Sequence, residues 1–327
     1  MVHPITIVYH RDCADGSAAA WAAWRALKDD PGVGVQYITA DYDDSDVDIG
    51  VFAGRHVIIL DFSYKVDVLK QIDNVACSVL IIDHHKTAKE DLSDISPLSV
   101  KTWPDYKKLL SSYTPISDGK AGEYDSLGLS ERWSVNAIFD MEHSGAMLAW
   151  TFFHGRQSVC PYLIKLVEDR DLWIFKYELS KAINIASLSL GDDLSAWDEF
   201  AKDVEKDAKA IAESSKVIEQ YRTAEIQRLL RHSFTMRIHD HDFPVVNAPR
   251  SLRSEVAHAL SEKTGSPYTA SYYDTAVGRR FSLRGTKDCP IDLDRVAKLF
   301  GGGGHRTASG FTVPMSKIID PGTDSSF

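Results

Sequence analysis

The stretch Val79-Leu80-Ile81-Ile82-Asp83-His84-His85-Lys86 decides how the first half of the chain folds. Four consecutive apolar residues are typical of a short strand that is buried on both faces of a parallel sheet. Two similar runs precede it, Ile5-Thr6-Ile7-Val8-Tyr9 and Val57-Ile58-Ile59-Leu60, and the alanine-rich segment from Ser17 to Leu27 has the composition of a helix. This order indicates βαβ units, so we predict an α/β fold with a parallel sheet covered on both faces.

Acidic residues or histidines directly follow each predicted strand. In chain order they are His10, Asp12, Asp15, Asp61, Asp83, His84 and His85. Because the carboxyl ends of neighbouring parallel strands open onto one crevice, we expect these side chains to converge there. Clustered carboxylates raise one another's pKa, so such a cluster persists mainly where cations neutralise it.

The donor types and their number predict the kind of metal site. Mixed carboxylate and imidazole donors favour Mn²⁺, Fe²⁺ or Zn²⁺ over Ca²⁺ or Mg²⁺. Six or seven candidate groups exceed what one catalytic ion uses, so we predict two ions, bridged by Asp61 at the end of the middle strand.

The rest of the chain indicates a second domain behind a helical connector. Residues 88–133 are rich in proline and glycine and predict an irregular insertion with one short helix. Asp198 to Arg231 contains neither residue type and repeats apolar positions at helical spacing. Beyond it, paired strands around Gly278 lead to a helix that runs into four glycines at 301–304. We predict a catalytic domain at 1–197, a helical connector at 198–233 and a smaller α/β domain at 234–327.

Composition excludes several classes of function. The chain of 327 residues has 37 Lys and Arg against 47 Asp and Glu, a net charge of -10, which argues against nonspecific binding of long DNA or RNA. No apolar run reaches the roughly 18 residues of a membrane span. The cysteines at 13, 77, 160 and 289 form no CxxC pair, so we expect free thiols in a reducing cytoplasm and no structural zinc site.

The motifs together resemble the DHH phosphoesterase superfamily with its associated DHHA1 domain. Asp83-His84-His85 after an apolar strand is similar to the signature of this family. The other motifs follow in the family's order: His10-Arg11-Asp12-Cys13-Ala14-Asp15-Gly16, Leu60-Asp61, Val167-Glu168-Asp169-Arg170-Asp171-Leu172-Trp173, and the glycine-rich segment from Gly301 to Phe311. The resemblance therefore covers nearly the whole chain.

The resemblance implies two Mn²⁺ ions and assigns their ligands. One ion would be held by His10, Asp12 and Asp61, and the other by Asp15, Asp61, His84 and Asp169. Asp169 is preferred to Asp171 because it directly follows the apolar run. Asp83 would orient an imidazole and His85 would face the substrate phosphate. The implied substrate-binding residues are His85, Arg284, Gly302, Gly303, Gly304, His305 and Arg306.

The implied reaction is hydrolysis of a phosphoester by a metal-activated water, without a protein nucleophile. Ser144 therefore fits a helix cap better than a nucleophile. We expect a phosphodiesterase that cuts short linear oligoribonucleotides, or dinucleotides such as pGpG or pApA, to 5′-mononucleotides, and a homodimer is plausible. An exopolyphosphatase or pyrophosphatase and a cyclic-dinucleotide phosphodiesterase stay open as alternatives. A non-catalytic nucleotide sensor would be expected to have lost ligands, whereas every candidate is present here.

Overall fold

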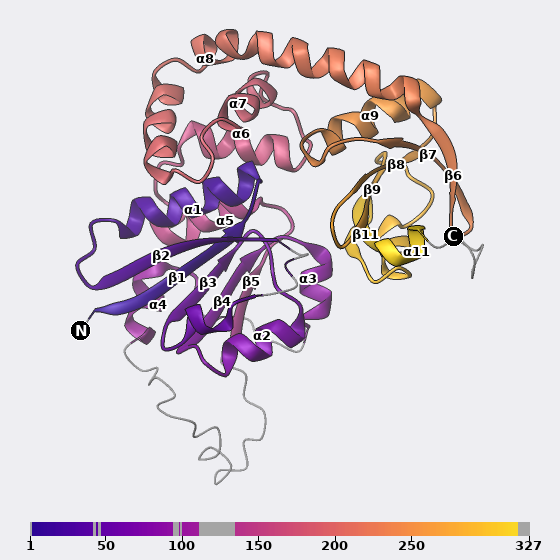
Figure 1. Ribbon diagram of the computed structural model, residues 1–327. Helices are drawn as coiled ribbons and strands as arrows, with labels where there is room; N and C mark the ends of the chain where they lie inside the picture. The colour runs from indigo at the N-terminus through magenta and orange to yellow at the C-terminus, as the bar shows by residue number, and fades with distance from the viewer. Residues whose placement is uncertain are drawn as a thin grey trace. The chain divides into compact units, whose positions relative to one another are not determined.

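The chain folds into two compact units, Met1–Lys216 and Val217–Phe327. The computed structural model describes residues 2–41, 44, 47–93, 98, 100–110 and 135–319 (Figure 1). Each unit has its own sheet, and the predicted α/β architecture, a parallel sheet followed by a long helix and a second sheet, is confirmed.

The first unit is built on a parallel sheet of five strands in the order β2-β1-β3-β4-β5. The strands are β1 (His3–His10), β2 (Val33–Ala40), β3 (His56–Leu60), β4 (Ser78–Asp83) and β5 (Val135–Phe139). Strands β1, β3 and β4 are those predicted from apolar runs. The search for apolar runs misses β2, because this edge strand is only partly buried. It also misses β5, because Asn136 interrupts the five residues of that strand.

Helices cover both faces of this sheet, as predicted. Ile58 and Leu60 pack with α1 (Ala14–Leu27) and α5 (Gly145–His154) on one face. Val57 and Ile59 pack with Leu69 of α2 (Val66–Asp73) on the other. The remaining helices of this part are α3 (Lys86–Asp91), α4 (Trp103–Leu110), α6 (Tyr162–Asp171) and α7 (Ser180–Ser187).

The strand order alone indicates where a ligand would bind. From β1 the chain passes to β2 on one side, and from β3 onward it continues on the other side, so the direction of winding reverses between β1 and β3. Ligands of open α/β sheets bind outside the carboxyl ends of the strands at such a point. His10 ends β1 and Asp61 directly follows β3, so both lie at this position.

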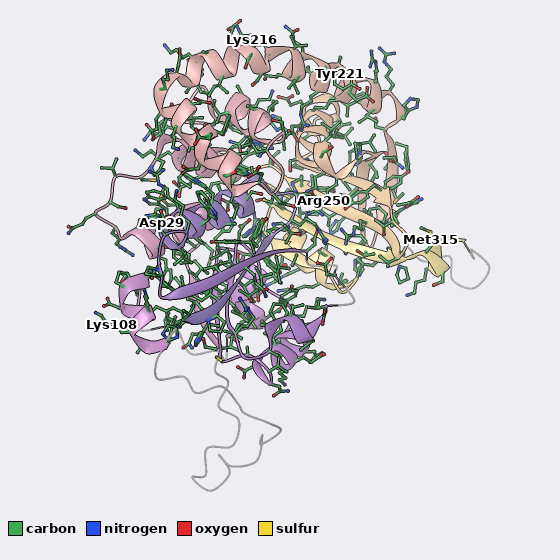
Figure 2. The ribbon with its side chains drawn as sticks, turned by 60° about the vertical axis from the view of Figure 1, so that its left-hand side comes forward. Asp29, Lys108, Lys216, Tyr221, Arg250 and Met315 are labelled. Atoms are coloured by element: carbon green, nitrogen blue, oxygen red, sulfur yellow. The ribbon has the colours of Figure 1, made fainter. Side chains whose placement is uncertain are left out.

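The long helix α8 (Leu194–Leu229) contains a kink at Asp207, where φ is −159° and ψ is 76°. The Asp207 carboxylate accepts a hydrogen bond from the Ala210 N–H at 3.0 Å, so it caps the second segment. The division between the two units falls within this helix, after Lys216; Figure 2 labels this residue and Tyr221 beyond it.

The second unit contains a mixed sheet in the order β10-β11-β9-β8-β7-β6, in which only β7 and β8 run parallel. Its strands are β6 (Phe234–Ile238), β7 (His241–Asn247), β8 (Tyr268–Asp274), β9 (Gly278–Gly285), β10 (Gly303–His305) and β11 (Ala308–Pro314). Its helices are α9 (Arg253–Thr264), α10 (Leu293–Lys298) and α11 (Met315–Ile319). Side chains of α9 and the end of α8 form one apolar cluster with β7, and α10 packs into a second cluster with β9 and β11.

The irregular insertion predicted at 88–133 falls largely on residues outside the described ranges, 111–134 among them. Within it, α4 packs Trp103, Tyr106 and Leu110 into the core of the first unit. Among the described residues, no helix combines the length and the apolar character needed to cross a membrane.

Candidate metal centre

The centre is organised around Asp61, which directly follows β3. Its backbone N–H donates to the carbonyl of Ile82 at 3.0 Å, and its φ of 62° lies in the left-handed region. The residue is 1% exposed. Its Oδ2 lies 3.5 Å from Nδ1 of His10, and its Oδ1 lies 3.3 Å from Nε2 of His84. One buried carboxylate is therefore held between two imidazoles from neighbouring strands.

His84 is shared among three carboxylates. Besides Asp61, its Nε2 lies 3.6 Å from Oδ2 of Asp171 and 3.8 Å from Oδ2 of Asp15. The donor atoms of Asp15, His84 and Asp171 all lie within 4.8 Å of one another. This spacing suits one cation bound by two oxygens and one nitrogen.

A second donor group adjoins the first through Asp61. It consists of His10, Cys13 and Asp61, whose donor atoms also lie within 4.8 Å of one another. The prediction that Asp12 completes this group is not met, because Asp12 is exposed and adopts a φ of 53°. That left-handed turn carries Asp12 outward, and Cys13 takes the place beside His10. Sequence analysis missed Cys13, although it stands between the two aspartates of the first motif.

The N-terminus of α5 holds Asp15 in place. The N–H groups of Gly145 and Ala146 donate to its two carboxylate oxygens at 2.6 and 3.0 Å. Position 145 must be glycine, because a Cβ there would lie 2.5 Å from Cβ of Asp61. Ser144 accepts a hydrogen bond from the N–H of Met147 at 3.4 Å, which confirms that it caps this helix.

Asp83 and His85 lie next to the two donor groups and contact each other. Oδ1 of the fully buried Asp83 accepts from the backbone N–H of His84 at 2.7 Å and lies 2.7 Å from Nδ1 of His85. This contact orients the His85 ring and fixes Nδ1 as the protonated nitrogen, since the carboxylate can only accept. Asp83, His84 and His85 also lie near Asp61, within 4.8 Å between donor atoms.

The structure does not bring Asp169, the preferred candidate, to the donor groups, and Asp171 lies beside His84 instead. The Asp169 carboxylate accepts from the N–H groups of Lys176 at 2.8 Å and Tyr177 at 3.0 Å, and from the hydroxyl of Ser180. Residues two apart on a helix point to nearly opposite sides, so only one of the two can face His84. Asp169 anchors the loop that follows α6, and Asp171 reaches the centre.

The electrostatics of the centre show strong coupling. Burial and the carboxylates of Asp61 and Asp171 raise the pKa of Asp15 well above its usual range. Burial opposes protonation of His84, yet the surrounding carboxylates raise the pKa of this imidazole to about 10. For Asp61, the imidazoles of His10 and His84 overcome the effect of burial and lower its pKa well below the usual range. Protons shared among buried acids can be replaced by divalent cations, which neutralise the same charge.

These residues fit a pair of cations. Both carboxylate oxygens of Asp61 are buried and have no hydrogen-bond partner. Leaving a buried carboxylate without donors is costly, and coordination of a cation removes that cost. Asp61 belongs to the group of His10 and Cys13, and its Oδ1 lies 3.3 Å from Nε2 of His84 in the other group. It therefore lies between the two candidate cation positions, where the sequence predicted a bridging carboxylate.

The glycine-rich segment of the second unit has structural reasons for its glycines. Gly301 has a φ of 76° where α10 ends, and Gly304 has a φ of 146° in the hairpin of β10 and β11. A Cβ on Gly302 would lie 2.0 Å from the carbonyl oxygen of Gly310. The backbone therefore favours glycine at these three positions, and Gly303 pairs with Gly310 in the sheet. The predicted role of Gly302, Gly303 and Gly304 in binding substrate stays a prediction.

The predicted substrate-binding cations of this unit are engaged within it. A guanidinium nitrogen of Arg306 donates to the carbonyl of Cys289 at 2.8 Å, although the residue is exposed. Arg284 donates to the carbonyl of Leu283 at 2.9 Å and to Ser254 of α9 at 3.3 Å. His305 ends β10 and is partly exposed. Their role in binding stays a prediction.

Comparison with known proteins supplies a relative for the sequence. No family model matches the chain. The uncharacterized protein R106 of Acanthamoeba polyphaga mimivirus is 26% identical over 339 residues, which cover 97% of this chain and 70% of that protein.

Two solved structures are similar in fold over 97% of this chain. One is a DHH domain described as a member of a family of ribosomal proteins, with 14% identity, a TM-score of 0.49 and coverage of 84% of that chain. The other is RecJ from Thermus thermophilus in complex with Mn²⁺, with 13% identity and a TM-score of 0.49, of which this chain spans 50%. The likeness concerns the fold alone, and the proposals below rest on the geometry of the site.

Substituting each of the two acids of α6 separately tests which of them binds metal. Asp171→Asn should weaken Mn²⁺ binding at least about tenfold, measured by calorimetric titration, because a ligand is lost. It should leave the free energy of unfolding nearly unchanged, since it also removes a repulsive charge. Asp169→Ala should instead lower the free energy of unfolding by about 3 kcal/mol, because buried donors lose their acceptor. Equal effects of the two variants on Mn²⁺ binding would contradict the assignment.

The glycine-rich segment can be tested at Gly302. Gly302→Ala should lower the free energy of unfolding by about 1–3 kcal/mol, measured by denaturant titration, because the added methyl meets the Gly310 carbonyl. Gly34→Ala is the control, since its methyl would meet only Val2 at 3.6 Å. A Gly302→Ala protein of normal stability would return this glycine to a ligand-binding role.

Proposed function

We propose that the protein is a metal-dependent phosphoesterase of the DHH type. The observation that carries this proposal is the buried Asp61 carboxylate, which makes no hydrogen bond and lies between His84 on one side and His10 with Cys13 on the other. A paired cation centre at the carboxyl ends of a parallel sheet suits hydrolysis of phosphate esters, where the main task is to offset the charge of the phosphoryl group.

The side chains present define what each part of the centre does. Two divalent cations, when bound, would acidify a water and offset the negative charge of the phosphoryl oxygens. Asp15 is fixed by two backbone amides and His84 is surrounded by three carboxylates, so both hold their positions without a ligand. Preorganised donors of this kind need no rearrangement during the reaction.

His85 is the residue best placed to meet the substrate. Its Nδ1 proton is held by Asp83, and its side chain is 22% exposed, whereas that of His84 is 6% exposed. Burial lowers the pKa of His85, but the Asp83 carboxylate outweighs burial and raises this pKa. The raised pKa favours a protonated ring. A cationic His85 can donate from Nε2 to a phosphoryl oxygen or to the leaving oxygen.

We infer that the substrates are short linear oligoribonucleotides or dinucleotides, such as pGpG or pApA, cut to 5′-mononucleotides. A net charge of -10 disfavours long nucleic acid, which requires a basic groove. A few local cations suffice for a substrate with one or two phosphates.

An aromatic loop beside the centre favours a substrate that carries bases. Trp173 and Phe175 follow the donor Asp171 and are 38% and 41% exposed, with ring centroids 5.0 Å apart. Both have positive φ values, 59° and 53°, in a region that bulky residues avoid. Strained, exposed aromatics next to a reactive centre are typical of ligand contacts. A polyphosphate offers nothing to stack on them, so this loop disfavours the exopolyphosphatase and pyrophosphatase alternative.

Product analysis tests the proposed reaction. With Mn²⁺, we expect mononucleotides from pGpG and pApA, little cleavage of cyclic di-GMP, and no orthophosphate from pyrophosphate or tripolyphosphate. Asp61→Ala should abolish turnover, because it removes the carboxylate between the two donor groups. It should also lower the free energy of unfolding, because the imidazoles of His10 and His84 lose the carboxylate that they stabilise. Release of orthophosphate from the polymers alone would keep the metal centre and overturn the substrate assignment. Full turnover by Asp61→Ala would overturn the centre itself.

The aromatic loop can be tested separately. Trp173→Ala should raise KM for dinucleotides about tenfold, since stacking on one base contributes roughly 1–3 kcal/mol. Tyr221→Ala is the control, because Tyr221 is an exposed aromatic residue on α8. A dialkyl phosphate is the reference substrate, because it carries no ring that could stack and so reports on the chemistry alone. An equal loss on both substrates would show that the loop is structural.

A further inference from the structure

Cys13 occupies an unusual place at the start of α1. It is the N-cap residue, and its carbonyl accepts the N–H of Ser17 at 2.9 Å, but its side chain makes no capping hydrogen bond. Ser, Thr, Asp or Asn at this position would stabilise the helix by about 1 kcal/mol. The thiol thus contributes nothing to the cap, and its side chain points instead toward His10 and Asp61.

The surrounding backbone fixes the thiol against His10. A Cβ on Gly16 would lie 2.4 Å from the carbonyl oxygen of His10, so the first turn of α1 packs directly on the end of β1. The left-handed turn at Asp12 then sets Cys13, rather than Asp12, on the inner side. The fold therefore places the backbone of Cys13 beside His10, within reach of the donor atoms of His10 and Asp61.

An independent observation marks the same position as a cation site. Asp61, which is 1% exposed, has two carboxylate oxygens without hydrogen-bond donors, and one of them lies 3.5 Å from His10. The nitrogen, sulfur and oxygen donors at this position lie within 4.8 Å of one another and would supply three of the four ligands that a zinc-type site uses. The other group, Asp15, His84 and Asp171, offers only oxygen and nitrogen.

We propose that Cys13 is a thiolate ligand of one ion of this centre, and that its subsite selects a thiophilic ion such as Zn²⁺, Co²⁺ or Fe²⁺. Thiolates favour these ions, whereas carboxylate-rich groups suit Mn²⁺ or Mg²⁺. The two subsites then differ in ion preference, although Asp61 lies close to both His10 and His84. This inference rests on the proposed metal centre and departs from the expectation of two Mn²⁺ ions.

Cobalt titration tests the thiolate directly. The full chain is stripped of metal with a chelator and titrated with Co²⁺, while bound metal is counted by equilibrium dialysis. We expect a near-ultraviolet band from thiolate-to-cobalt charge transfer that saturates with one of two bound ions. Cys13→Ser should lose the band and weaken binding of that ion at least about tenfold. Cys160→Ser is the matched control, because the Cys160 thiol lies 3.8 Å from Met147 and outside both donor groups, and it should retain the band.

A second variant distinguishes the loss of the thiolate ligand from the loss of the fold. Cys13→Asp replaces sulfur with oxygen and should shift the ratio of Zn²⁺ to Mn²⁺ affinity at least about tenfold toward Mn²⁺. Circular dichroism of the apo proteins checks that the variants are folded.

The outcomes separate this inference from the proposed function. Two Co²⁺ ions bound by the wild-type protein without a charge-transfer band would overturn the role of Cys13 and leave the two-metal centre intact. A band that survives in Cys13→Ser would do the same. No stoichiometric Co²⁺, Zn²⁺ or Mn²⁺ binding at all would overturn the centre and this inference together.

Discussion

The structure is constrained by the mutual repulsion of three carboxylates, those of the buried Asp15 and Asp61 and of the half-buried Asp171, around the imidazole of His84. Like charges at this distance in a region of low dielectric oppose folding unless something neutralises them. Backbone amides of α5 meet Asp15, and imidazoles meet Asp61 from two sides. These contacts stabilise the arrangement only in part, which is why the remaining charge is best balanced by bound cations.

The backbone around the centre is arranged to permit this crowding. Gly16 and Gly145 lie where any Cβ would meet His10 or Asp61, so two helices approach the strand ends more closely than side chains normally allow. Asp12 and Asp61 adopt left-handed φ values, which cost energy in residues other than glycine. Strain of this kind persists where the surrounding packing enforces it, and here the sheet order already brings β1 and β3 together at the reversal of winding.

The sequence predicted what depends on strand ends and missed what depends on local turns. Apolar runs located β1, β3 and β4, and therefore His10, Asp61 and His84. The half-buried β2 has no such run, so Asp41, which directly follows it, was not among the candidates. Oδ1 of Asp41 lies 4.0 Å from Nε2 of His10. The choice between Asp12 and Cys13 depends on one φ angle, and the choice between Asp169 and Asp171 depends on helical phase. Neither is visible in a motif that records only the order of residues.

Asp169 and Asp171 together connect the metal centre to the surface that surrounds it. The Asp169 carbonyl accepts the N–H groups of Ile174 and Phe175 at 2.9 and 3.3 Å, and its carboxylate accepts those of the next two residues. These bonds hold the strained aromatic loop, which begins two residues after the donor Asp171. Both acids lie in the last turn of α6, so the loop and the proposed ligand Asp171 are held by the same turn of helix. The orientation of the aromatic loop and the geometry of the donor group therefore depend on the same helix end, so the proposed substrate contact and the proposed metal binding are expected to be coupled.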